Sequence, residues 1–236
     1  MHDPERIIIA LDSSDADTVL NWVMLLQDSR CAFKLGLEAF VAFGPDLVRR
    51  ITGSGARLFL DLKFHDIPNT TAQAAVSASS LGIWMMNLHA SAGPAVIAET
   101  RKRLDATGKK PLLIGVTVLT HLTPEELAAI GVGLSPKEWA VKLAQTGKAA
   151  GLDGVVCSAH EAASIKEACG KEFVTVVPGI RLPEGDVHDQ KRIATPSFAF
   201  ANGADYIVVG RPIRQAADPR AQAEAIQKTI AGLFAS

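Results

Sequence analysis

The amino-acid sequence predicts an α/β protein, a (β/α)8 TIM barrel that occupies residues 1–236 as a single domain. Short apolar runs alternate with helical patterns along the whole chain, and these runs number eight. The length of 236 residues also suits one such barrel, which usually takes roughly 200–250 residues. An open doubly wound sheet shows the same alternation, so only the count of eight favours the barrel over it.

The expected strands are apolar almost throughout, as in a parallel sheet whose strands are buried on both faces. They are residues 6–12, 31–37, 56–63, 82–89, 111–119, 151–158, 173–179 and 204–210. Parallel neighbours need a crossover connection, and crossovers are right-handed. Eight strand–helix units in succession therefore close into a barrel.

The segments between these runs have helical patterns. Residues 14–27 and 218–235 each carry one apolar stripe with the spacing of a helix face. Thr123, Ser135 and Ser158 each stand three residues before a glutamate, which is the spacing of a capping box. These residues predict where three of the helices begin.

Composition limits the possible functions. Hydrophobic residues make up 48% of the chain and charged residues 21%, which excludes disorder, collagen and coiled coil as descriptions of the whole. A net charge of −1 argues against binding nucleic acid or membranes through bulk charge. The chain has three cysteines in no metal or redox spacing, no secretory signal pattern and no apolar run of about 18 residues. We expect a cytoplasmic protein with reduced thiols.

The active site of such a barrel lies at the C-terminal ends of its strands. Asp61 and Lys63 are two residues apart there, so on a strand they point to the same face. Since Leu58, Leu60 and Leu62 are expected to face the helices, that face is the barrel interior. Two charges inside a barrel are costly unless they are paired.

Asp12 ends the first expected strand and Lys34 lies on the second at an equivalent height, so four ionisable groups are expected to converge. Their alternating signs favour protonated lysines and ionised aspartates. This clustering at the strand ends points to a functional site. The alternative is a structural ion-pair network that closes the top of the barrel.

Two further segments follow the last strands, where barrels commonly bind phosphate. Pro178 and Gly179 end the seventh expected strand, and Gly210 and Arg211 follow the eighth. Backbone N–H groups and a forked guanidinium suit an anion, although Arg211 could also be an ordinary surface arginine. The histidines have no metal-ligand spacing, and no Gly-rich nucleotide loop is present. No metal or cofactor is predicted.

Residues 61–70, DLKFHDIPNT, closely resemble the orotidine 5′-phosphate decarboxylase family. Matches to this family extend from residue 6 to residue 214 and include the segments 10–12, 33–36, 177–181, 189–192 and 209–213. The resemblance implies a carboxy-lyase that converts orotidine 5′-monophosphate to UMP and CO2 in de novo pyrimidine synthesis, without a cofactor. Loss of CO2 leaves a carbanion at C6 that no cofactor stabilises, so a fixed ammonium is needed.

The resemblance also assigns roles to individual residues. Lys63, Asp61, Asp66 and Lys34 would form the charged catalytic network, with Lys63 stabilising and protonating the carbanion. The implied substrate-binding residues are Asp12, Lys34, Asp66, Ile67, Thr70, Thr120, Pro178, Arg181, Gln190, Gly210 and Arg211. The family implies a homodimer in which Asp66, Ile67 and Thr70 enter the partner's site, and a loop, residues 180–192, that closes over the phosphate. No nucleic-acid or membrane partner is expected.

Two other functions fit parts of this pattern. Sugar-phosphate lyases of the same superfamily share a DxKxxD string but use Mg²⁺, and they carry a glutamate ligand where this chain has Lys34. A second lysine at that position argues against a bound cation. A barrel that binds nucleotides without catalysis is the other alternative. The intact Asp61, Lys63 and Asp66 argue against it.

Overall fold

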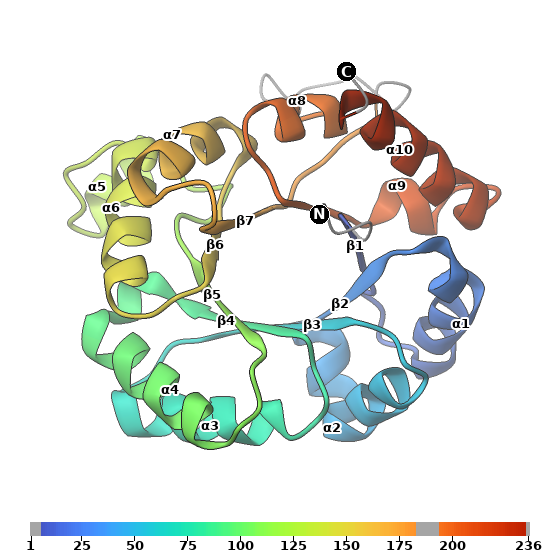
Figure 1. The fold of residues 1–236 in the computed structure, drawn as a ribbon, viewed down its shortest axis with the longest axis horizontal. Helices are drawn as coiled ribbons and strands as arrows, with labels where there is room; N and C mark the ends of the chain where they lie inside the picture. Colours follow the sequence, from blue (N-terminus) through green and yellow to red (C-terminus); the bar gives the residue numbers. More distant parts are fainter. Residues whose placement is uncertain (1–5, 183–193, 235–236) are drawn as a thin grey trace.

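The computed structural model describes residues 6–182 and 194–234. Its eight strands form one closed sheet in which each strand pairs in parallel with the next, and β8 pairs with β1. Figure 1 shows the strands around a central axis with the helices outside them. The predicted barrel is therefore confirmed, and the open doubly wound sheet is excluded.

All eight expected strands are present. They are β1 (Ile7–Ala10), β2 (Ala32–Gly36), β3 (Leu58–Phe64), β4 (Met85–His89), β5 (Leu112–Val116), β6 (Gly154–Val156), β7 (Val174–Val177) and β8 (Tyr206–Val209). All eight are shorter than expected, because apolar composition continues into the loops where pairing has already stopped. Asp12, expected as the end of the first strand, lies two residues beyond β1.

The helices surround the barrel. They are α1 (Ala16–Leu26), α2 (Leu37–Gly53), α3 (Pro68–Ser79), α4 (Pro94–Ala106), α5 (Pro124–Ala129), α6 (Pro136–Ala149), α7 (Ala159–Cys169), α8 (Pro196–Ala201), α9 (Arg211–Arg214) and α10 (Pro219–Phe234), with short 3₁₀ turns η1 (Gln27–Ser29) and η2 (Ala90–Ala92). The capping boxes at Thr123, Ser135 and Ser158 are all present. The prediction of these three helix starts is confirmed.

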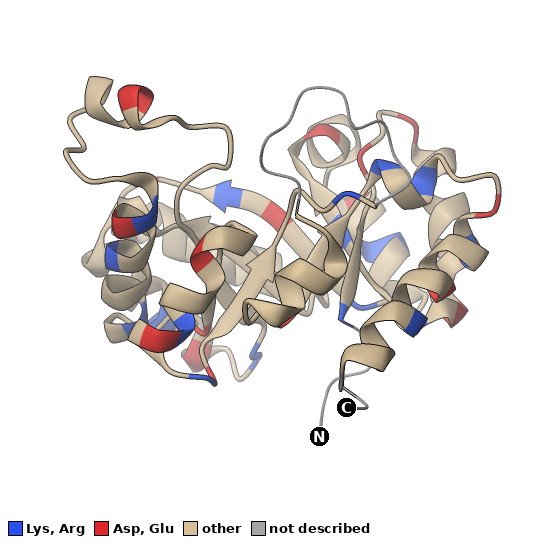
Figure 2. Cartoon of the chain, turned by 90° about the horizontal axis from the view of Figure 1, so that it is seen from above, with Lys and Arg blue, Asp and Glu red and all other residues tan. Residues whose placement is uncertain are grey.

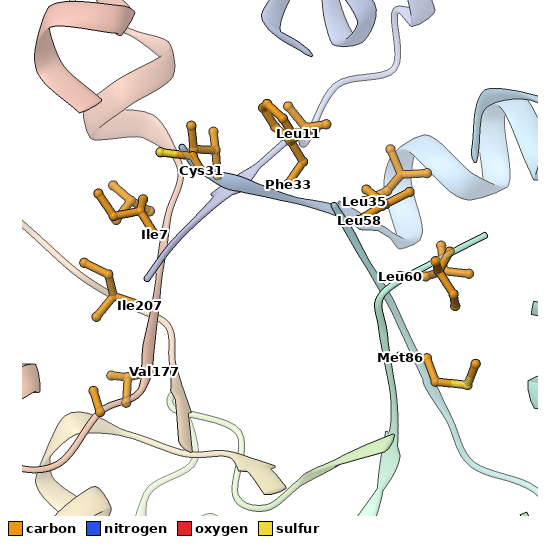
Figure 3. Packing of buried hydrophobic residues seen from close by; sticks show 14 of the residues in the cluster. Ile7, Leu11, Cys31, Phe33, Leu35, Leu58, Leu60, Met86, Val177 and Ile207 are labelled. Carbon is orange, nitrogen blue, oxygen red and sulfur yellow. The ribbon is translucent and has the colours of Figure 1, made fainter. Parts of the chain in front are cut away.

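Apolar side chains fill two separate layers. In the outer layer, alternate strand residues such as Leu58, Leu60 and Ile207 point away from the axis toward the helices (Figure 3). The inner layer fills the barrel and includes Phe59 and Met85. On β3 the next inward residue after Phe59 is Asp61, so the strand places this carboxylate on top of an apolar plug.

The surface charges are mixed in sign. Figure 2 shows Lys and Arg interspersed with Asp and Glu along the helices, without a large region of one sign on this side. Of the helices in residues 6–182 and 194–234, none combines the length and the apolar character needed to cross a membrane.

Candidate active site

Four charged side chains form a row at the C-terminal ends of β1, β2 and β3. Asp61 lies between two ammonium groups: its Oδ2 is 3.0 Å from Nζ of Lys34, and its Oδ1 is 2.7 Å from Nζ of Lys63. Lys34 is also 3.4 Å from Oδ1 of Asp12. The four groups expected to converge thus lie together, in the order Asp12, Lys34, Asp61 and Lys63, with alternating sign.

The row fixes the charge states of its buried members. Burial by itself lowers the pKa of Lys34, but the carboxylates of Asp61 and Asp12 outweigh it and raise the pKa above its ordinary value. Burial likewise raises the pKa of Asp61, and the ammonium groups of Lys34 and Lys63 with the amide of Asn87 reverse this, so the net direction is downward. Both groups stay charged at neutral pH.

The backbone of β3 is irregular where it carries these residues. Its register against β4 shifts between Leu60 and Phe64, and Lys63 has a φ of 51°, which is rare for a residue other than glycine. The alternation argument places Asp61 and Lys63 correctly beside each other, but the strand is not regular there. Sequence reasoning did not detect this distortion, because nothing in the residue types around Lys63 signals it.

Asp66, Ile67 and Thr70 lie on the loop after β3 and at the start of α3. All three are exposed in the single chain, with 65% of Ile67 accessible. The carboxylate of Asp66 accepts a hydrogen bond from the backbone N–H of Ile67 at 2.7 Å. Among the ion pairs of the described residues, none joins Asp66 to the row, so one chain alone does not bring this carboxylate into the network.

Two adjoining cavities open at this end of the barrel. The first, of about 170 Å³, is mainly apolar. It is lined by Lys34, Phe59, Asp61, Lys63, Val116, Val118, Leu119, Thr120, Val156, Cys157, Pro178 and Val208. Lys63 and Thr120 therefore reach a space whose other walls are largely hydrocarbon, a suitable size and surface for a flat ring.

The second cavity, of about 330 Å³, is lined by polar and cationic groups. Its lining comprises Ala10, Asp12, Lys34, Asp61, Pro178, Gly179, Ile180, Arg181, Val208, Gly210, Arg211 and Arg214. Three arginines and the start of α9 make it suitable for an anion. Lys34, Asp61, Pro178 and Val208 line both cavities, so the ion-pair row stands where they join.

The sequence places Asn87 at the end of the fourth strand, but no role was predicted for it or for Arg214. Arg214 donates from Nη1 to the backbone carbonyl of Asp12 at 2.6 Å, and its guanidinium stacks on Trp22 with 4.8 Å to the ring centroid. Asn87 is completely buried and hydrogen-bonds Asp61. The inward position of Asn87 near the end of β4 was the signal in the sequence that it belongs to the site. For Arg214, the signal was its place three residues after Arg211. Gln190, expected at the phosphate, lies outside the described residues.

Two histidines stand beside Lys63. The rings of His65 and His89 are 5.2 Å apart, and burial, with His65 and Lys63 nearby, lowers the pKa of His89. Within the described part of the chain, no three His, Cys, Asp or Glu side chains are grouped so that they could hold a metal ion. Lys34 places its ammonium between Asp12 and Asp61, and this charge opposes a metal cation at those two carboxylates.

A closed parallel barrel with a partly buried charged row and two cavities at the carboxyl ends of its strands has the architecture of a barrel enzyme. The chain belongs to the orotidine 5′-phosphate decarboxylase / HUMPS family, whose model matches residues 5–226. The fold and these matches identify it as a carboxy-lyase of that family.

Its relatives match over nearly their whole length. The orotidine 5′-phosphate decarboxylase of Pseudoalteromonas atlantica is 50% identical over 232 residues, which are 98% of this chain and 100% of the relative. That of Vibrio cholerae is 48% identical over 231 residues, with the same coverage. The crystal structure of the enzyme from Lactobacillus acidophilus has a TM-score of 0.85 and 36% identity, and the match covers 95% of this chain and 98% of that one.

The row predicts a pH-dependent effect of Asp61→Asn. This change leaves two ammonium groups without their shared carboxylate and should lower the free energy of unfolding at pH 7 by about 3–5 kcal/mol. In the wild type the Asp61 contribution is lost only as the pH falls through its lowered pKa, and that of Lys34 only as the pH rises through its raised pKa. In the variant, burial outweighs the remaining carboxylate of Asp12 and lowers the pKa of Lys34. The loss of unfolding free energy should therefore shrink toward pH 9.5.

Urea unfolding of both proteins at pH 7 and pH 9.5, at one fixed protein concentration, measures this difference. A gap that stays constant or widens with pH would contradict the electrostatic account of the row.

Proposed function

We propose that this protein decarboxylates orotidine 5′-monophosphate to UMP and CO2, the last step of de novo pyrimidine synthesis, without a metal or an organic cofactor. The observation that carries the proposal is the ammonium of Lys63, held 2.7 Å from Asp61 at the wall of the apolar cavity. The names of the curated relatives support the same substrate.

The reaction requires a fixed positive charge. When the bond between C6 and the carboxylate breaks, CO2 leaves and the electron pair stays on C6 in the plane of the ring, where the π system cannot accept it. A preorganised ammonium in a cavity that excludes water stabilises such a charge strongly. Lys63 then transfers a proton from Nζ to C6 and forms UMP, and it regains that proton from water.

The other members of the row position this ammonium. Asp61 binds both lysines and, in the complex, faces the carboxylate that leaves as CO2. Lys34 and Asp12 bind the ribose hydroxyls at the join of the two cavities. A second ammonium at Lys34 also neutralises the two carboxylates that a Mg²⁺ ion would need, which supports chemistry without a metal.

The two cavities suit the two ends of the nucleotide. The pyrimidine takes the apolar cavity, where Thr120 contacts it. The 5′-phosphate takes the polar cavity, bound by Arg211, Arg181 and the backbone near Pro178 and Gly210. Gln190 completes the phosphate site, and the loop of residues 180–192 closes over it. Binding energy from this distant group can then organise the reacting end.

A second copy of the chain completes each site. Asp66, Ile67 and Thr70 are exposed, and in the proposed homodimer they enter the partner's cavity beside its Lys63. Asp66 then extends the alternating row by one more negative charge. We also propose that residues 1–236 form one domain and that the enzyme is cytoplasmic.

Replacing Lys63 tests the proposed chemistry. Lys63→Ala removes both the charge stabilisation and the proton donor, so kcat for orotidine 5′-monophosphate should fall at least about 10⁴-fold. The loss of orotate absorbance measures turnover. Lys228→Ala, an exposed lysine on α10, is the matched control and should keep kcat within about two-fold.

The same assay in EDTA addresses the metal-dependent alternative. Full activity is expected after chelation. A strict Mg²⁺ requirement, or near-native turnover by Lys63→Ala, would contradict the proposal.

Mixing two inactive variants tests the shared site. Lys63→Ala and Asp66→Ala should each be inactive alone, and heterodimers formed from them contain one intact site. With statistical pairing, half of the dimers are mixed and half of their sites are intact, so about a quarter of wild-type activity should return. If native mass spectrometry shows heterodimers but no activity returns, Asp66 does not act across the interface.

A further inference from the structure

Strand β3, which carries Asp61 and Lys63, is distorted at these two residues. Pairing of β3 with β4 runs from Leu60 opposite Met86 directly to Phe64 opposite Leu88, so β3 has four steps where β4 has two. The β3 residues between these two pairs are Asp61, Leu62 and Lys63. Such a bulge removes ladder hydrogen bonds from the bulged strand. The left-handed backbone at Lys63, with φ at 51°, needs support from its surroundings.

Asn87 occupies this bulge. It lies on β4, and its side chain is completely buried. Its Oδ1 accepts the backbone N–H of Lys63 at 2.8 Å, and its Nδ2 donates to Oδ1 of Asp61 at 2.6 Å. One amide therefore supplies the partner that the distorted strand lacks and fixes the carboxylate that binds both ammonium groups.

We propose that Asn87 is a positioning residue for the decarboxylation: it holds the backbone of Lys63 and the carboxylate of Asp61 so that the Lys63 ammonium faces the reacting carbon. The inference rests on the proposed function. The residue type matters, because an amide presents one acceptor and one donor on the same planar group. A carboxylate of the same shape has no donor and repels Asp61, and an aliphatic side chain has neither group.

Other charged groups around the bulge must be considered in any pH experiment. Asp61 and Lys63 face Asn87 from β3, and Lys34 reaches the same carboxylate from β2. His89 follows on β4 itself, and His65 lies against it. All of these groups are present in the wild type and in each variant of position 87, so the pH profile of the wild-type enzyme is measured beside that of each variant.

Asn87→Leu removes both hydrogen bonds at similar volume. We expect kcat to fall by about 10² or more, with the Kd for UMP within about three-fold of the wild type, because UMP binding does not need the aligned ammonium. The matched control is Thr117→Val, which removes a partly buried hydrogen bond of 2.8 Å just after neighbouring β5 without touching the row. Its kcat should stay within a few-fold. Equal losses in both variants, or an unchanged kcat in Asn87→Leu, would overturn the proposal.

Asn87→Asp gives a signature that a purely structural role would not produce. Near pH 7.5 the introduced carboxylate lacks the donor and repels Asp61, so kcat relative to wild type should fall about 10²-fold. The repulsion raises the pKa of the introduced group, and once protonated it can donate to Asp61 as the amide does. The activity ratio should therefore rise at least about ten-fold toward pH 5.5. A ratio that does not change with pH would overturn the inference.

Hydrogen exchange at the backbone amide of Lys63 tests the role of Asn87 independently of the proposed function. It also provides a test if Asn87→Leu does not fold. In the wild type the amide of Lys63 should exchange slowly, and in Asn87→Asp at pH 5.5 it should remain protected. Rapid exchange in the folded wild-type protein would overturn the positioning role. An enzyme that protects this amide but does not turn over orotidine 5′-monophosphate would instead refute the proposed function alone.

Discussion

The carboxylate of Asp61 holds two lysine ammonium groups at the open end of a barrel whose interior is otherwise packed with apolar side chains. At Lys34, burial alone would favour the neutral amine, and the carboxylates of Asp61 and Asp12 outweigh it. Asp61 is ionised for the same reason, since the two ammonium groups outweigh the cost of its burial. The charges of Lys34 and Asp61 therefore depend on one another, and the backbone must hold the groups of the row close together.

The barrel meets this requirement by combining a regular scaffold with one local irregularity. Most of the sheet is regular, and apolar layers pack on both of its faces. Among the strands of the described residues, only β3 departs from this pattern, through the bulge and the left-handed backbone at Lys63, and the buried amide of Asn87 supports the departure. The row then lies at the join of an apolar and a cationic cavity. In the proposed reaction, the apolar cavity excludes water from the pyrimidine ring. The cationic cavity binds the 5′-phosphate, which anchors the nucleotide.

Much of this arrangement could be predicted from the sequence, because it follows from periodicity. Alternation along β3 placed Leu58 and Leu60 against the helices and Asp61 inside, and three capping boxes located helix starts correctly. The strand ends were less predictable, since apolar residues continue past the last paired residue, as between Ala10 and Asp12. The distortion at Lys63 could not be predicted, because it depends on a tertiary contact with Asn87 from the next strand. For the same reason the stacking of Arg214 on Trp22 was not expected.

The central claim is that the ammonium of Lys63 stabilises negative charge at C6 and exchanges a proton with that carbon. Proton NMR of UMP in D2O tests this directly, because deprotonation at C6 forms the same carbanion without loss of CO2. The account predicts that the wild-type enzyme replaces the C6 hydrogen of UMP by deuterium, and that Lys63→Ala binds UMP without exchanging it. Equal exchange rates in the two proteins would contradict the account and require another proton donor.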